Sequence, residues 1–165
     1  MKPRRPEKQC FELLSCDGWT LSESLICQKN WRSLILPDFP EPIEIKRLSQ
    51  YSTLRNKSFL YIVANGGAVK TVTERILSTK SEIKKSIHKY INSSIVFFDE
   101  STSYVYFKSS DNQYRIISGE AEFVEFCTHH IKYDVYEEWK IFFNYEDADS
   151  EKIEELEYIW NSYTK

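Results

Sequence analysis

Short runs of apolar, β-branched and aromatic residues, separated by polar turns, dominate the middle of the chain. The three clearest runs lie within residues 94–118 and read SIVFFDE, SYVYFKS and QYRIIS. Only a few residues connect them, and such short connections favour antiparallel hairpins. The pattern therefore predicts a three-stranded antiparallel meander over about 94–118, with further candidate strands near 10–14 and 58–64.

Helical spacing occurs on both sides of this meander. Thr79 and Glu82 form a capping-box pattern ahead of an apolar stripe that ends at Ile91. Near the end of the chain, residues 150–163 place apolar side chains three and four positions apart, with glutamates mostly outside that stripe. A small antiparallel sheet packed against several helices is an α+β fold, and this is the class we expect.

Three segments are harder to assign from their pattern. Residues 22–36 fit a short helix only in part. The run from Ala68 to Leu77 places apolar residues near one helical face, so we expect a helix there. From Glu120 to Phe143, large apolar residues recur at steps of three and four, which favours an amphipathic helix. Alternation at residues 119–126 also fits a strand.

Length and composition indicate a soluble, globular protein. The chain has 165 residues, of which 41% are apolar and 28% charged. We expect residues 1–9, which contain two prolines, to form a flexible arm, and residues 10–165 to form a single α+β domain. No apolar run reaches the roughly 20 residues that span a bilayer. The basic N-terminus is not followed by an apolar signal segment, and no cysteine pair has C-x-x-C spacing. These features predict free thiols in the cytoplasm.

The net charge of −3 conceals two halves of opposite sign. Residues 1–100 contain sixteen Lys and Arg against eleven Asp and Glu, whereas residues 101–165 contain six against fourteen. From Glu120 onward there are thirteen acids and four bases. A strongly acidic segment repels nucleic acid phosphates and attracts basic proteins.

Large aromatic residues alternate with these acids, which suits a protein interface. Carboxylates steer the encounter with a basic partner, and large rings supply most of the binding free energy. An acidic surface above an ordinary aromatic core is an equally good interpretation of the same pattern. The candidate partner-binding residues are Glu122, Glu125, Tyr133, Asp134, Tyr136, Glu137, Glu138, Trp139, Tyr145 and Asp147.

A catalytic site is the first alternative. Helical spacing would place His130 on one face with Cys127 and Asp134, so a small hydrolase or transferase could use the histidine as a base. A catalytic cysteine and its base usually come from separate elements, which argues against this arrangement. The same residues are too few to hold a metal ion without a ligand from elsewhere. We therefore expect neither a metal nor a cofactor.

A nucleic-acid-binding domain is the second alternative. Lys84, Lys85 and Lys89 cluster on one predicted helix, and the aromatic residues of the meander could stack bases on a sheet surface. The acidic half of the chain argues against this function. A solvated helix face is the simpler interpretation of the lysines.

In size, acidity and aromatic content the chain resembles small bacterial immunity proteins, which neutralise a cognate toxin. The resemblance covers no alignable motif, so it assigns no role to any residue. It implies a non-catalytic inhibitor whose carboxylates cover the basic cleft of a partner such as a nuclease toxin.

Overall fold

The computed structural model describes residues 13–15, 20–66, 69–111 and 113–164. Six strands form one antiparallel sheet in the order β1-β6-β5-β4-β2-β3. The strands are β1 (Arg32–Pro37), β2 (Phe59–Gly66), β3 (Val69–Leu77), β4 (Ser94–Phe98), β5 (Tyr104–Lys108) and β6 (Tyr114–Gly119).

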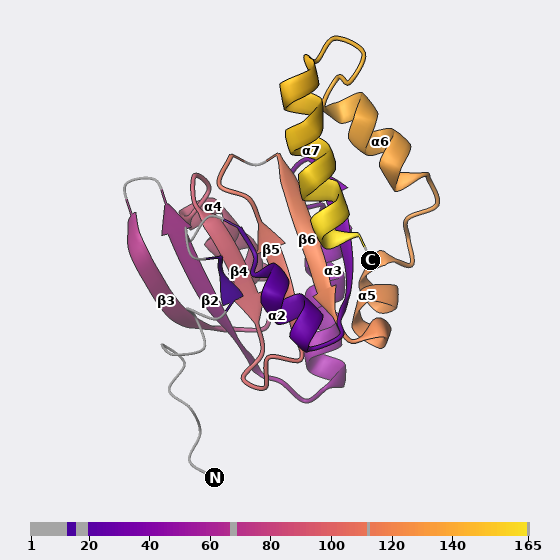
Figure 1. Ribbon diagram of the computed structural model, residues 1–165. Helices are drawn as coiled ribbons and strands as arrows, with labels where there is room; N and C mark the ends of the chain where they lie inside the picture. The colour runs from indigo at the N-terminus through magenta and orange to yellow at the C-terminus, as the bar shows by residue number, and fades with distance from the viewer. Residues whose placement is uncertain (1–12, 16–19, 67–68, 112, 165) are drawn as a thin grey trace.

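Helices cover both faces of the sheet, which confirms the predicted α+β class (Figure 1). One face packs against α3 (Pro42–Leu54), α4 (Lys80–Lys89) and α5 (Ala121–Thr128). The other face packs against α2 (Glu23–Gln28), α6 (Val135–Phe142) and α7 (Ser150–Tyr163).

The predicted meander is present and forms the centre of the sheet. Its side chains alternate between the two cores: Phe97 and Tyr106 face α3 and α5, whereas Val96 and Phe107 face the opposite layer. Every residue of β4, β5 and β6 is buried. Because both faces are covered, these strands are mostly apolar instead of alternating with polar residues, and their two charged residues, Lys108 and Arg115, are buried as well.

The prediction of a helix from Ala68 to Leu77 is wrong for the described residues, because β3 begins at Val69 and pairs with β2. Ala68 lies outside the described residues. The sequence of β3 alternates in the manner of a strand: Val72 and Ile76 pack partly against the core, and Thr73 and Arg75 are exposed between them. The three- and four-residue spacing of the valines and Ile76 fits a helix equally well, so the pattern alone did not distinguish the two structures.

The other uncertain segments divide into shorter elements. Residues 22–36 contain both α2 and most of β1. The expected helix after Glu120 is interrupted, because α5 ends at Thr128 and α6 begins only at Val135. The predicted arm at residues 1–9 lies outside the described residues, and so do residues 10–12 of the candidate strand near 10–14. Within that candidate strand, Leu14 forms an isolated bridge with Leu21.

Helices α6 and α7 lie side by side, and the segment that joins them extends past the end of the sheet (Figure 1). Aromatic contacts hold the pair together: the Trp160 ring of α7 lies 4.9 Å from that of Tyr136 and 5.6 Å from that of Trp139. Among the described residues, no helix is both long enough and apolar enough to cross a membrane.

Candidate functional site

The predicted acidic surface is divided between two layers of the fold. Glu122 and Glu125 lie on α5, which packs on one face of the sheet, whereas Glu137 and Glu138 lie on α6, which packs on the other. Glu125 is paired with Arg32 at 2.8 Å, in an exposed ion pair. The candidate residues therefore do not form one continuous patch, and the α6 side holds most of them.

Trp139 differs from its expected role as an exposed anchor, because its side chain is fully buried. Its ring contacts Tyr114 of β6 and Trp160 of α7, and its Nε1 donates a hydrogen bond to the Tyr145 hydroxyl at 2.9 Å. This residue fixes α6 to the sheet and to α7. Trp139 is a core residue, and a partner cannot reach it in this conformation.

Three more of the candidate residues have structural contacts. The Asp134 carboxylate caps α6 by accepting hydrogen bonds from the backbone amides of Tyr136 and Glu137. The Tyr136 hydroxyl donates to Glu157 at 2.6 Å, and this hydrogen bond raises the pKa of Tyr136 to about 12. Tyr145 is half-buried beneath Trp139. These side chains define the shape of the α6–α7 pair.

The outer face of α6 remains open to a partner. Glu137 and Glu138 are exposed, and one turn later Ile141 is 71% exposed and Phe142 43% exposed. Residues i, i+3 and i+4 of a helix are neighbours, so the two glutamates border the apolar pair. We call these four residues, Glu137, Glu138, Ile141 and Phe142, the α6 face.

A groove of about 320 Å³ lies beside this face, at the junction of α6 and the turn that follows it. Its lining residues are Glu137, Lys140, Ile141, Asn144, Tyr145 and Glu146. Within it, the Lys140 ammonium lies 2.5 Å from the Glu137 carboxylate. Asp147, another candidate residue, accepts a hydrogen bond from the Asn144 side chain at 2.9 Å in the same turn.

The proposed catalytic residues are not assembled. Both ring nitrogens of His130 are buried and have no hydrogen-bond partner among the described residues. Asp134 instead caps α6. Cys127 is almost fully buried, and this burial raises the pKa of its thiol well above the ordinary value. A protonated, inaccessible thiol is a poor nucleophile, so the geometry does not favour the hydrolase or transferase alternative.

The lysine cluster and the meander also differ from the arrangement that nucleic-acid binding would need. Lys85 pairs with Glu82 at 2.7 Å, and Lys89 pairs with Glu74 at 2.5 Å. The aromatic side chains of β5, Tyr104, Tyr106 and Phe107, are buried beneath helices on both faces of the sheet. They therefore cannot stack bases.

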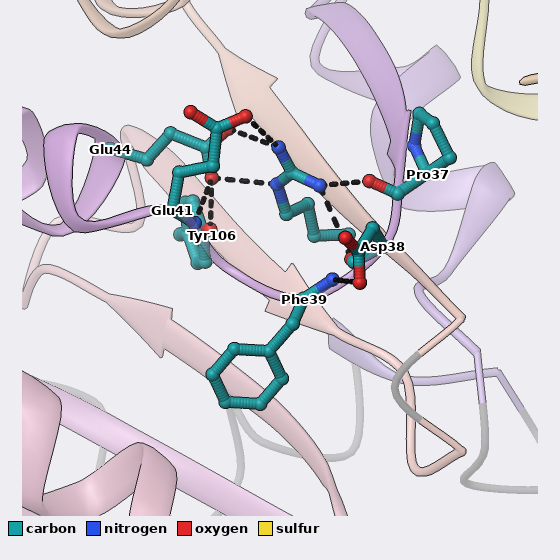
Figure 2. Close-up of polar contacts among 7 residues, drawn as sticks. Pro37, Asp38, Phe39, Glu41, Glu44 and Tyr106 are labelled. Carbon is teal, nitrogen blue, oxygen red and sulfur yellow. Dashed lines mark hydrogen bonds and ion pairs between the residues drawn. The ribbon is translucent and has the colours of Figure 1, made fainter. Parts of the chain in front are cut away.

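A buried ionic cluster, which the sequence patterns did not reveal, joins β6 to α3 (Figure 2). The Arg115 guanidinium and the Glu44 carboxylate form two hydrogen bonds, from Nε at 2.7 Å and from Nη2 at 2.6 Å. Tyr106 also donates its hydroxyl proton to Glu44, at 2.7 Å. Burial alone would lower the pKa of Arg115, but the hydrogen bonds and charge of Glu44 raise it above its ordinary value.

The remaining donors of Arg115 are satisfied as well. Nη1 donates to the backbone carbonyls of Pro37 and Asp38, and Nη2 also donates to Glu41 at 3.1 Å. A guanidinium has five N–H groups, and all five have acceptors here. The cluster thus fixes the connection between β1 and α3, and the guanidinium has no N–H left for a ligand.

Two signals in the sequence could have revealed this cluster. Arg115 interrupts an otherwise apolar strand, and Glu44 lies in the first turn of a helix that begins at Pro42. A charged residue within a buried strand needs a partner, because an isolated buried charge is very costly.

The part of the chain that the structure describes contains no group of three or more His, Cys, Asp or Glu residues placed to hold a metal ion. No protein-family model, curated protein or solved structure matches this chain.

Proposed function

We propose that this protein is a non-catalytic binding protein that docks the α6 face onto a basic protein partner. The observation that supports this best is the exposure of Ile141 and Phe142 on a helix whose other face is well packed. Trp139, on the same helix, is fully buried. The helix is therefore firmly attached, and the exposed apolar pair is not a sign of poor packing.

The composition of the α6 face matches that of a protein interface. Interfaces have an apolar centre with polar residues at the rim, and a few large side chains contribute most of the binding free energy. Here Ile141 and Phe142 would form the centre, and Glu137 and Glu138 the rim.

Charge indicates what kind of partner would dock. Residues 134–164, which include α6 and α7, contain ten acids and two lysines, so the field on this side of the molecule is negative. Such a field accelerates association with a basic protein and disfavours nucleic acid. A nuclease toxin fits this requirement, because its cleft is basic. Its inhibitor would present carboxylates where the phosphates of the nucleic acid bind. The expected site of action is the cytoplasm.

Affinity capture with matched variants tests this proposal. Four baits are used: the full-length wild type, the single variant Ile141→Asp, and two double variants. One double variant carries Glu137→Gln and Glu138→Gln on α6, and the other carries Glu122→Gln and Glu125→Gln on α5. The last bait is the control, because it also removes two exposed acids, but on α5, where Glu125 pairs with Arg32 and Glu122 pairs with Arg55. Captured proteins are identified by mass spectrometry.

We expect the wild type and the α5 control to retain the same basic protein. Ile141→Asp should abolish its retention, and the double α6 variant should weaken it most at low salt, where steering by charge is strongest. The proposal fails if the wild type retains nothing beyond what Ile141→Asp retains. It also fails if only the α5 variant loses the partner.

A further inference from the structure

The groove at the end of α6 combines carboxylates, an aromatic ring and an apolar wall. Glu137 and Glu146 line it together with the half-buried Tyr145 and the exposed Ile141. A volume of about 320 Å³ is at the small end of the range for ligand pockets, so it suits one long side chain better than a large molecule.

Lys140 already places a cation in this groove. Its Nζ lies 2.5 Å from a carboxylate oxygen of Glu137 and 4.9 Å from the centre of the Tyr136 ring. A carboxylate and an aromatic face both attract ammonium and guanidinium ions. Glu146 forms no ion pair with any described residue, so one carboxylate of the groove is still available.

The backbone at this end of α6 adds to the negative potential. The carbonyl groups at the C-terminal end of a helix carry partial negative charge, which favours a cation nearby. The last turn of α6 continues directly into the groove through Asn144 and Tyr145. The two carboxylates, the Tyr145 ring in the groove lining and the helix end therefore all favour a positively charged group.

We propose that this groove binds a lysine or arginine side chain of the partner, and that Lys140 occupies part of the site in the free protein. This inference rests on the proposed function and adds to it the chemical class of the group that enters the groove. Arginine should bind better than lysine, because its planar guanidinium can pair with a carboxylate and stack on a ring at the same time.

A nuclear magnetic resonance titration of the full-length protein with argininamide, lysinamide and norleucinamide tests this inference. Concentrations up to about 50 mM at low ionic strength are needed, because an exposed cation–carboxylate pair gives only millimolar affinity. The amide signals of Asn144, Tyr145 and Glu146 should shift with argininamide, less with lysinamide, and not with neutral norleucinamide.

Two lysine variants provide a matched comparison. Lys140→Met removes the competing cation and should strengthen argininamide binding by about twofold to fivefold. Lys152→Met is the control, because Lys152 also pairs with a glutamate three residues away, Glu155, but on α7 and outside the groove lining. It should leave the titration unchanged.

The inference is overturned if argininamide causes no saturable shift in either the wild type or Lys140→Met. It is also overturned if a Glu137→Gln/Glu146→Gln variant binds argininamide as well as the wild type does. If a partner is captured in an Ile141-dependent way but argininamide causes no shift, the groove proposal is rejected and the proposed function stands. A positive titration without any captured partner would reject the proposed function instead.

Discussion

Arg115 connects β6 with the start of α3 through its hydrogen bonds to Glu44, which lies 71 residues earlier in the chain. Arg115→Met should lower the free energy of unfolding by about 3–5 kcal/mol, because the Glu44 carboxylate would remain buried without its cation. Urea unfolding followed by tryptophan fluorescence measures this loss. Arg32→Met is the control: its ion pair with Glu125 is exposed at both ends, so removal should cost less than about 1 kcal/mol. Equal small losses in the two variants would contradict the structural role of Arg115.

Lys108 gives the fold a specific dependence on pH. Its ammonium is buried and donates to the carbonyls of Ile91 and Ser109, and burial lowers its pKa to about 8 from an ordinary 10.5. Between those two pH values the unfolded chain holds one more proton than the folded chain, so stability rises with pH. Below pH 8 both states are protonated, and the cost of burying the charge is fully present.

Urea unfolding at pH 7, 8 and 9 tests this behaviour against Lys108→Met. Other titrating groups are the same in both proteins and cancel from the difference in unfolding free energy. That difference should move in favour of the wild type as the pH rises from 8 to 9. A constant difference would mean that Lys108 does not titrate in this range.

At the scale of single elements, the start of α6 depends on Asp134. Asp134→Ala should lower the free energy of unfolding by about 1 kcal/mol, because two backbone amides lose their acceptor. Asp134→Asn should stay close to the wild type, since asparagine caps a helix nearly as well. Thermal unfolding of the two variants checks this. If both lose the same stability, the charge of Asp134 matters more than its capping geometry.

The two sides of α6 should respond very differently to truncation. Trp139→Ala should cost about 3–5 kcal/mol, because it removes a fully buried ring from contacts with β6 and α7. Ile141→Ala should change stability by no more than about 0.5 kcal/mol, because this side chain is largely exposed. Urea unfolding of both variants is the measurement. A large loss for Ile141→Ala would mean that the side chain belongs to the core.

The sequence predicted those elements that carry a strong local signal. The meander, α4 with its Thr79 cap and α7 all correspond to patterns that tertiary contacts do not override. β3 was missed because its spacing of apolar residues fits a helix as well as a strand. The Arg115 cluster was missed because its partners are 71 residues apart in the chain and meet only in the folded protein.

At the scale of the whole molecule, the fold separates the acidic residues that the sequence places together. Only six residues separate α5 from α6, yet the two helices pack on opposite faces of the sheet. Local charge patterns cannot reveal this, because it depends on how the chain passes around the edge of the sheet. The candidate surface is therefore limited to the α6 side, and Trp139 belongs to the core and not to that surface.

Hydrogen exchange of the full-length protein, alone and with the partner captured by affinity, tests the proposed docking surface most directly. If the partner docks on the α6 face, residues 135–146 should exchange more slowly in the complex. The exchange rates of α5 and β3 should be the same as in the free protein. Protection of α5 or β3 with an unchanged α6 would contradict the account.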